Sequence, residues 1–411
     1  DNLDSILNAG REIGMMSKYG GGTSCYLGNI RPRGSVISTG GHADGPVHYA
    51  RIYDTVVDVC KQSEARRGAC AAYLPLEHPD IEEFLDIGTE GNPIQNLQYG
   101  VTVTNNWIEH MKSGDKTKRK IWAKVIQRRS EFGFPYIMFK DNSNDNSPYK
   151  ELGMEITASN LCSEIQLPTD TYNSFVCCLG SINLLHWDEI IKTDAIETYV
   201  FFLNAVMDEF IKKAEVKAGL KRAYNFAKDH RAIGLGVLGY HSLFQSKLIE
   251  FESLAPTKSS SFIHGAVSMG IEPIKSNYFI KDLAKSKTIY KNPFLECELE
   301  KYGLNTKKTW DSILKKDGSV QHLDFPTKEV FKSFVEISPK ELVLQAAQRQ
   351  KYIDQSQSLN LMIHPSVPAK DINKLYLYAH EEGVKTLYYQ FSQSSAQDFA
   401  RNILECSSCE G

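Results

Sequence analysis

Three side chains that could do chemistry occupy alternate positions near the middle of the chain: Asn160, Cys162 and Glu164. A second thiol, Cys177, follows after a short polar excursion. In an extended strand, residues two apart point to the same side, so an amide, a thiol and a carboxylate would share one face. That combination, with another thiol in reach, indicates redox or radical chemistry. A buried strand whose cysteines serve as small apolar residues would show the same spacing, and the spacing alone favours this second interpretation.

The sequence around these residues resembles the active-site loop of the large subunit of class I ribonucleotide reductase, in its bacterial and phage forms. The resemblance rests on Asn-Leu-Cys-x-Glu-Ile-x-Leu-Pro at residues 160–168 and on Val-Cys-x-Leu-x-Ser-Ile-Asn-Leu at residues 176–184. It implies a ten-stranded α/β barrel, here incomplete, with this loop as a finger through its centre. Strand-like segments alternate with helix-like ones along the chain, which agrees with the α/β class.

The resemblance also assigns roles in the reduction of a ribonucleotide to a 2′-deoxyribonucleotide, a precursor of DNA. It implies that a thiyl radical on Cys162 abstracts the 3′-hydrogen of the substrate. Glu164 would accept the proton of the 3′-hydroxyl as general base. Asn160 would hold the substrate's hydroxyls by hydrogen bonds, and Cys177 would supply reducing equivalents and end in a disulfide.

Two further pairs of residues have a place in this scheme. Tyr388 and Tyr389 would be the last two residues of a radical-transfer path that leads from a partner small subunit to Cys162. Adjacent aromatic residues more often serve packing, which is the alternative interpretation. The radical would come from a metallocofactor of that subunit, so no metal ligand and no bound cofactor are expected in this chain. Cys406 and Cys409 would form a mobile dithiol that re-reduces the active site and is itself reduced by thioredoxin or glutaredoxin.

Nucleotide-binding positions are implied in three places by the same resemblance. A helix predicted over residues 1–19 ends at a triple glycine, whose Gly22 would lie beside the substrate. A hydroxyl-rich turn, which would otherwise be interpreted as a polar loop, would bind the substrate phosphates; its residues are Pro256, Thr257, Lys258, Ser259 and Ser260. Allosteric dNTP or ATP effectors, whose triphosphates suit the planar fork of arginine, would bind at Asp1, Leu3, Arg31, Gln62 and Arg66.

One motif points to a different class of enzyme. Gly234, Gly236 and Gly239 match the GxGxxG pattern of dinucleotide-binding proteins, which would indicate a nicotinamide dehydrogenase. That fingerprint needs a strand before it and a helix after it, whereas a long helix precedes it here, with Asp194 and Glu197 as a predicted capping box. We therefore expect these glycines to serve packing.

Composition narrows the class of protein. The chain has 411 residues, of which 42% are hydrophobic and 24% charged, as is ordinary for a soluble globular protein. Its formal net charge of -3 implies no broad surface for nucleic acid. No apolar run is long enough to cross a membrane, and no signal peptide opens the chain. Nine irregularly spaced cysteines fit a reducing cytoplasm rather than a secreted disulfide framework.

The expected organisation is a catalytic barrel over residues 1–395 and a flexible redox tail over residues 396–411. Relative to the family, an ATP cone, a helical domain and the cysteine that pairs with Cys177 would be missing before Asp1, and a helical insertion between Ser253 and Leu254. The predicted function is the catalytic subunit of ribonucleoside-diphosphate reductase, or the C-terminal portion of a split one that joins a separate N-terminal half, working as a homodimer. The alternative is an inactive remnant that binds nucleotide or the small subunit without turnover.

Overall fold

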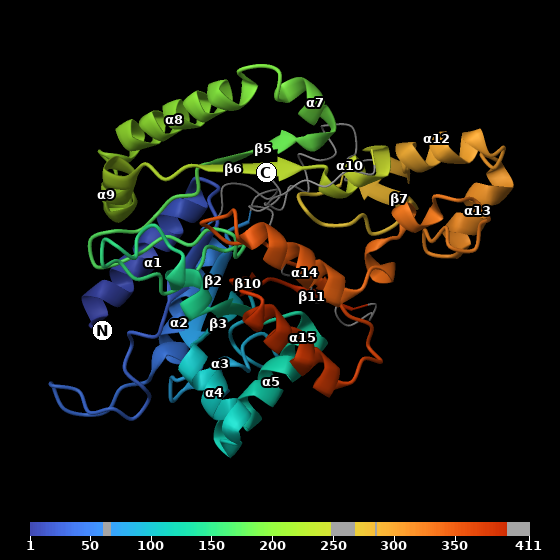
Figure 1. The fold of residues 1–411 in the computed structure, drawn as a ribbon. Coiled ribbons are helices and arrows are strands. Elements are labelled where there is room, and N and C mark those ends of the chain that lie inside the picture. The colour runs from blue at the N-terminus through green and yellow to red at the C-terminus, as the bar shows by residue number, and fades with distance from the viewer. Residues whose placement is uncertain (61–66, 248–267, 284–285, 393–411) are drawn as a thin grey trace.

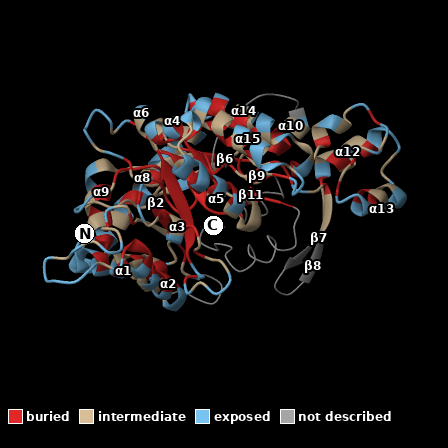
Figure 2. Cartoon of the chain, turned by 90° about the horizontal axis from the view of Figure 1, so that it is seen from below, coloured by how far each residue is buried: buried red, intermediate tan, exposed pale blue. Residues whose placement is uncertain are grey.

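A five-stranded sheet forms the centre of the fold in the computed structural model, which describes residues 1–60, 67–247, 268–283 and 286–392. Its strands are β1 (Thr23–Tyr26), β2 (Cys70–Pro75), β3 (Gln98–Val103), β4 (Tyr136–Phe139) and β10 (Thr386–Leu387). They lie in the order β1-β2-β3-β4-β10; the first four are parallel, and β10 runs antiparallel to β4. Every residue of β3 and β4 is buried, as expected for parallel strands covered on both faces (Figure 2).

Helices connect and cover these strands. Between β1 and the end of β4 the chain forms α2 (Pro46–Val59), α3 (Ile81–Phe84), α4 (Asn105–Ser113) and α5 (Lys116–Phe132). The predicted first helix is confirmed as α1 (Leu3–Lys18), where the Asn2 side chain accepts a hydrogen bond from the Ser5 amide at 2.8 Å. Ile6 and Ile13 of α1 face the core, so the periodic apolar positions of this helix fix its packing.

The remaining strands form pairs. β5 (Leu179–Asn183) lies parallel to β6 (Gly234–Leu238), β9 (Leu361–Met362) lies parallel to β11 (Gln390–Phe391), and β7 (Tyr278–Leu283) lies antiparallel to β8 (Ser286–Lys291). Gly234 and Gly236 belong to β6 itself, not to a turn between strand and helix, which agrees with the rejection of a dinucleotide fingerprint.

The long helix predicted after residue 194 is confirmed as α8 (Ala195–Ala214), which runs along the β5–β6 pair (Figure 1). The predicted capping box is wrong, because Asp194 is the N-cap residue but its side chain makes no cap hydrogen bond. Other helices are α6 (Lys140–Asp145), α7 (Trp187–Ile190), α9 (Lys221–His230), α10 (Tyr240–Lys247), α14 (Pro339–Gln350) and α15 (Ala369–Glu381). Short 3₁₀ turns lie at Leu184–His186, Ala218–Leu220, Lys328–Phe331 and Phe334–Glu336. None of the helices in the described ranges could span a membrane.

A helical lobe projects from the main body and has an apolar core of its own (Figure 1). It contains α12 (Pro293–Lys301) and α13 (Lys307–Lys315). Its buried residues are Leu295, Leu299, Trp310, Ile313, Val320, Phe325 and Phe331. The main core is a separate cluster that is centred on the five-stranded sheet and also includes Leu161 and Cys162. The stretch that carries the candidate chemistry is therefore packed onto the sheet, although residues 154–178 form no helix or strand.

Candidate active site

Cys162 lies in a tight turn, so residues 160–164 do not form the extended strand in which the three side chains would share one face. The backbone amide of Asn160 donates to the carbonyl of Ile165 at 2.9 Å, and the backbone amide of Ile165 donates to the side-chain oxygen Oδ1 of Asn160 at 3.0 Å. Between them, Ser163 has a positive φ of 68°. This left-handed conformation is uncommon for a residue with a side chain and must be held by its surroundings.

Hydroxyl groups from distant parts of the chain hold the turn. The Thr386 hydroxyl donates to the carbonyl of Ser163 at 3.1 Å, and the Ser358 hydroxyl donates to the carbonyl of Cys162 at 2.6 Å. On the sheet side, the hydroxyl of Tyr73 lies 3.5 Å from that of Ser163. These contacts fix the two peptide units that flank Ser163, directly after Cys162, which is 8% exposed.

The turn still brings the predicted residues together. The Asn160 side-chain nitrogen donates to the sulfur of Cys177 at 3.6 Å, and the Asn160 side chain also hydrogen-bonds Glu164. Asn160, Cys162, Glu164, Cys177 and Gly22 all line one cavity with a volume of about 1030 Å³. A cavity of this size, between the glycine turn before β1 and the Cys162 turn, can accommodate a nucleotide.

Burial keeps two groups of the cavity protonated to a higher pH than usual. It raises the pKa of Glu164, and hydrogen bonds from its own backbone, Asn160 and Ser358 offset part of that effect. The Cys177 side chain touches solvent, but it does so inside the cavity, where burial and the nearby Glu164 and Cys162 raise the pKa of its thiol. A neutral thiol keeps the hydrogen that a radical reaction would take from it.

Tyr388 and Tyr389 lie at the point where the chain passes from one sheet to another. Tyr388 follows β10 and Tyr389 precedes β11, so the pair lies between two short strands. Their ring centroids are 4.3 Å apart. The chain is anchored two residues earlier by Thr386, whose hydroxyl holds the carbonyl of Ser163 next to Cys162. Thr386 therefore connects the segment that carries the tyrosine pair to the Cys162 turn.

Comparison with known proteins identifies the family to which the chain belongs. The family profile described as "Ribonucleotide reductase, barrel domain" matches residues 1–119, 114–255 and 251–390. The chain belongs to this family. It is 30% identical to the ribonucleoside-diphosphate reductase large subunit of Invertebrate iridescent virus 3, with 95% of this chain and 81% of that protein covered. The solved class Id ribonucleotide reductase alpha subunit of Actinobacillus ureae is 47% identical and superposes with a TM-score of 0.89, covering 99% of this chain and 83% of that one.

The ribonucleotide reductase assignment confirms the predicted α/β barrel class, the resemblance and the enzyme class.

Some of the other predicted site residues lie within the described ranges and some lie outside them. Asp1 and Arg31 lie together, because the Arg31 guanidinium forms an ion pair with the Asp1 carboxylate at 2.6 Å. Leu3 is exposed nearby on α1. Residues outside the described ranges are Gln62, Arg66, Pro256, Thr257, Lys258, Ser259, Ser260, Cys406 and Cys409. Within those ranges, no three His, Cys, Asp or Glu side chains converge on a possible ion site.

Several residues around the ribonucleotide reductase site were not found from the sequence. Tyr136 on β4 packs its ring 4.6 Å from that of Tyr388 and 5.2 Å from that of Tyr389. The Cys70 thiol donates to the sulfur of Cys25, which lines the cavity, at 3.9 Å. The hydrogen bond from Cys70, together with burial, raises the pKa of Cys25, which marks it as an unreactive thiol. No local pattern signals these contacts, since each joins segments far apart in the sequence.

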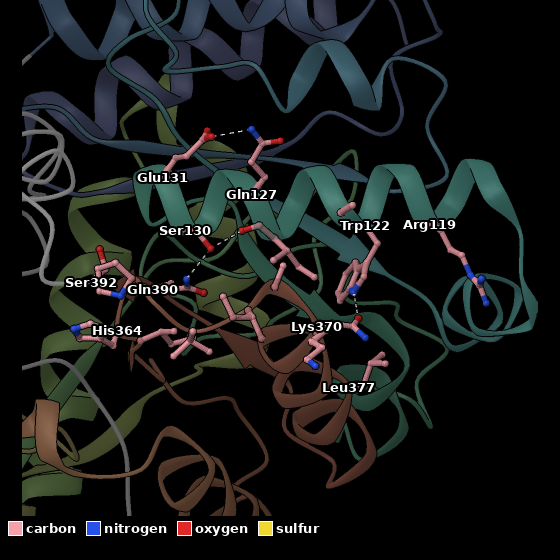
Figure 3. A pocket seen from close by; sticks show the side chains of 18 of the residues that line it. Arg119, Trp122, Gln127, Ser130, Glu131, His364, Lys370, Leu377, Gln390 and Ser392 are labelled. Carbon is pink, nitrogen blue, oxygen red and sulfur yellow. Dashed lines mark hydrogen bonds between the residues drawn. The ribbon is translucent and has the colours of Figure 1, made fainter.

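A second, mainly apolar groove of about 840 Å³ lies between α5 and the β9–α15 region (Figure 3). Gln390, which directly follows Tyr389, lines it and donates to the Ser130 hydroxyl of α5 at 3.2 Å. The indole of Trp122 donates to Asn373 of α15 at 2.8 Å and closes the floor. The charged residues that line the groove are Lys112, Arg119, Lys370 and one acid, Glu131.

Proposed function

We propose that this chain catalyses the radical reduction of ribonucleoside diphosphates to 2′-deoxyribonucleoside diphosphates. One observation carries the proposal: a thiol, a carboxylate, an amide and a second thiol line one nucleotide-sized cavity, at Cys162, Glu164, Asn160 and Cys177. The names of the relatives, which are ribonucleoside-diphosphate reductase subunits, support the same reaction.

The radical would reach the cavity through this chain's own tyrosines. A metallocofactor held by a small subunit would supply the oxidising equivalent. Tyr389 and Tyr388 would pass it inward, each losing and regaining an electron and a proton, until the thiol of Cys162 becomes a thiyl radical. The 4.3 Å separation of the two rings suits transfer between them. Tyr388 is 4% exposed, which keeps its oxidised form from solvent.

Each of the residues that line the cavity would have its own role in the reaction. The Cys162 radical takes the 3′-hydrogen of the substrate, and Glu164 accepts the 3′-hydroxyl proton, which helps the 2′-hydroxyl to leave as water. The raised pKa of Glu164 makes its carboxylate a stronger base than an exposed glutamate. Cys177 and a second thiol, which a separate N-terminal half would carry, supply two electrons and two protons and become a disulfide. Cys162 then returns the 3′-hydrogen and Glu164 returns the proton of the 3′-hydroxyl, so neither the radical nor the base is consumed.

Several partners follow from this proposal. The groove of Figure 3 is the proposed contact site for the small subunit, because its lining residue Gln390 directly follows Tyr389, where the oxidising equivalent would enter. Its excess of Lys and Arg over Glu favours an acidic, partly apolar segment of that subunit. We further propose a homodimer in the cytoplasm and dNTP or ATP effectors beside Asp1, Leu3 and Arg31, with Gln62 and Arg66 completing that site.

The proposed substrate-phosphate site comprises Pro256, Thr257, Lys258, Ser259 and Ser260. Cys406 and Cys409 would return electrons from thioredoxin or glutaredoxin to the active site. Mutation of both tail cysteines to Ser should therefore block turnover with thioredoxin and leave a single turnover intact.

An inactive nucleotide-binding remnant is not favoured, because Cys162, Glu164, Asn160 and Cys177 are all present and directed to one cavity. The decisive assay combines the chain with a separately expressed N-terminal half, a small subunit, a ribonucleoside diphosphate and a small dithiol, and measures deoxyribonucleotide. Formation of product supports the proposal. Nucleotide binding without product in the assembled complex would favour the inactive alternative.

A further inference from the structure

Ser358 stands between the two reacting residues of the cavity. Its Oγ lies 2.6 Å from the carbonyl oxygen of Cys162 and 3.2 Å from Oε2 of Glu164. The residue is 7% exposed, so water does not substitute freely for either contact. A hydroxyl carries one proton and can donate to one acceptor at a time, while its lone pairs accept other hydrogen bonds. The two contacts of Ser358 therefore depend on the proton that Glu164 does or does not carry.

We propose that Ser358 is a positioning residue that couples the protonation of Glu164 to the backbone of the Cys162 turn. While Glu164 is ionised, its carboxylate competes with the Cys162 carbonyl for the single hydroxyl proton, and charge favours the carboxylate. Once Glu164 has accepted a proton, the carboxylic acid donates to Ser358 Oγ, and Ser358 donates fully to Cys162. The Cys162 turn is then held most firmly after the proton transfer to Glu164, before Cys162 returns its hydrogen to the substrate. This inference rests on the proposed function.

The surroundings of Glu164 make this coupling strong. The titratable groups that face it are Cys162, Cys177 and Tyr73. Burial raises the pKa of Tyr73 to about 12 and also raises that of Cys177, so neither is ionised near neutral pH. No cation is among these described neighbours. The charge of Glu164 is therefore stabilised by its own backbone amide, by Asn160 and by Ser358.

The backbone that carries Ser358 is itself fixed. The Ser356 amide donates to the Glu164 carbonyl at 2.8 Å, and the Ser356 and Thr386 hydroxyls are 2.6 Å apart. These contacts hold the main chain near Ser358 in place, so Ser358 cannot move as a whole toward Glu164 or toward Cys162. A change in its hydrogen bonding must appear at Glu164 or at Cys162.

The test is to titrate Glu164 directly in the full chain by isotope-edited infrared spectroscopy of the protonated carboxyl band, with Glu164→Gln to assign it. Ser358→Ala removes a donor to the carboxylate and should raise the apparent pKa of Glu164 by about one unit. Ser358→Thr keeps the hydroxyl and should titrate as the wild type does. In the reconstituted enzyme, Ser358→Ala should lower kcat more than it changes KM, and the rising limb of the pH profile should move to higher pH.

Ser356→Ala is the matched control, because it removes a buried hydroxyl of the same segment that contacts Thr386 instead of the Glu164 side chain. It should lower the melting temperature without moving the titration. An unchanged titration in Ser358→Ala, or an equal shift in Ser356→Ala, would overturn the inference. If Ser358→Ala does not fold, Ser358→Cys replaces it, and its weaker donor should produce a smaller upward shift. The titration needs no turnover, so an enzyme without activity would refute the proposed function separately.

Discussion

The side-chain nitrogen of Asn160 lies 3.6 Å from the sulfur of Cys177. The oxygen of the same amide accepts the hydrogen bond from the Ile165 backbone that closes the Cys162 turn. One side chain therefore connects the thiol that would supply reducing equivalents to the turn that carries the radical thiol. Asn160 is 5% exposed, so both bonds are made away from bulk water.

Asn160→Ala should disorganise this connection. It leaves the Ile165 amide without its acceptor, which should lower the free energy of unfolding by about 1–3 kcal/mol. It should also lower kcat strongly, because Cys177 and the Cys162 turn lose their common support. Melting temperature and single-turnover product formation measure the two effects. Asn146→Ala, at an exposed position, is the control. Wild-type single-turnover yield in Asn160→Ala would show that the amide is not needed to hold the site.

Glu164 should give the protein a stability that depends on pH. Because burial raises its pKa in the folded state, the stabilisation is present below the ordinary glutamate pKa and is lost as pH rises through the raised value. Glu164→Gln mimics the neutral form, so its melting temperature should exceed that of the wild type by more at about pH 8 than at about pH 4. Each unit of pKa shift corresponds to about 1.4 kcal/mol. The same variant should lose turnover. A melting difference that does not change with pH would mean that Glu164 titrates normally.

The tyrosine pair can be tested by removing one hydroxyl at a time. Tyr388→Phe or Tyr389→Phe keeps the ring, and so most of the packing in a cluster whose centroids lie 4.3 Å apart. Phenylalanine is far harder to oxidise, so each variant should lose turnover while nucleotide affinity and melting temperature change little. Tyr352→Phe, in an exposed tyrosine, should retain full activity. Substantial deoxyribonucleotide yield in either variant of the pair would indicate that Tyr388 and Tyr389 serve packing.

The barrel class was predictable because it depends on local patterns and on a motif. The helix α1 lies within the predicted residues 1–19, and β2, β3 and β4 alternate with helices along the chain, as the sequence pattern indicates. The Cys162 turn was not predictable. Ser163 adopts a positive φ without a glycine to signal it, and the hydrogen bonds that compensate come from Ser358 and Thr386. The alternation of polar residues there is equally consistent with a strand, so only tertiary contacts decide.

The same reason explains which site residues the sequence could name. Cys162 and Glu164 stand in a recognisable motif, whereas Tyr136 has no distinctive local sequence. Ser358 lies in a stretch, residues 348–361, that also resembles the family, but the stretch does not reveal the contacts of Ser358 with Cys162 and Glu164. Tyr136 joins the tyrosine pair because β4 pairs with β10, a contact between residues about 250 positions apart. The capping box at Asp194 shows the opposite error, in which a fitting local pattern forms no hydrogen bond.

The groove beside Tyr389 predicts where the small subunit binds. Lys370→Glu reverses a charge in the groove and should weaken small-subunit binding roughly fivefold, with a larger effect at low salt. Lys374→Glu is the matched control, since it lies on the same helix α15 but does not line the groove. Immobilised small subunit and surface plasmon resonance give both affinities. Equal losses in the two variants would indicate a general charge effect instead of a contact site.

The most direct test of the account replaces the sulfur of Cys162. Wild type and Cys162→Ser are each assembled with the N-terminal half and small subunit and given ribonucleoside diphosphate and a small dithiol, and deoxyribonucleotide is measured beside nucleotide affinity. A serine hydroxyl cannot form the corresponding radical under these conditions, so the variant should bind nucleotide as the wild type does and yield no deoxyribonucleotide. Cys297→Ser, at an exposed cysteine of the helical lobe, should keep wild-type turnover. Turnover by Cys162→Ser would contradict the assignment of Cys162 as the radical residue and, with it, the mechanism proposed for this chain.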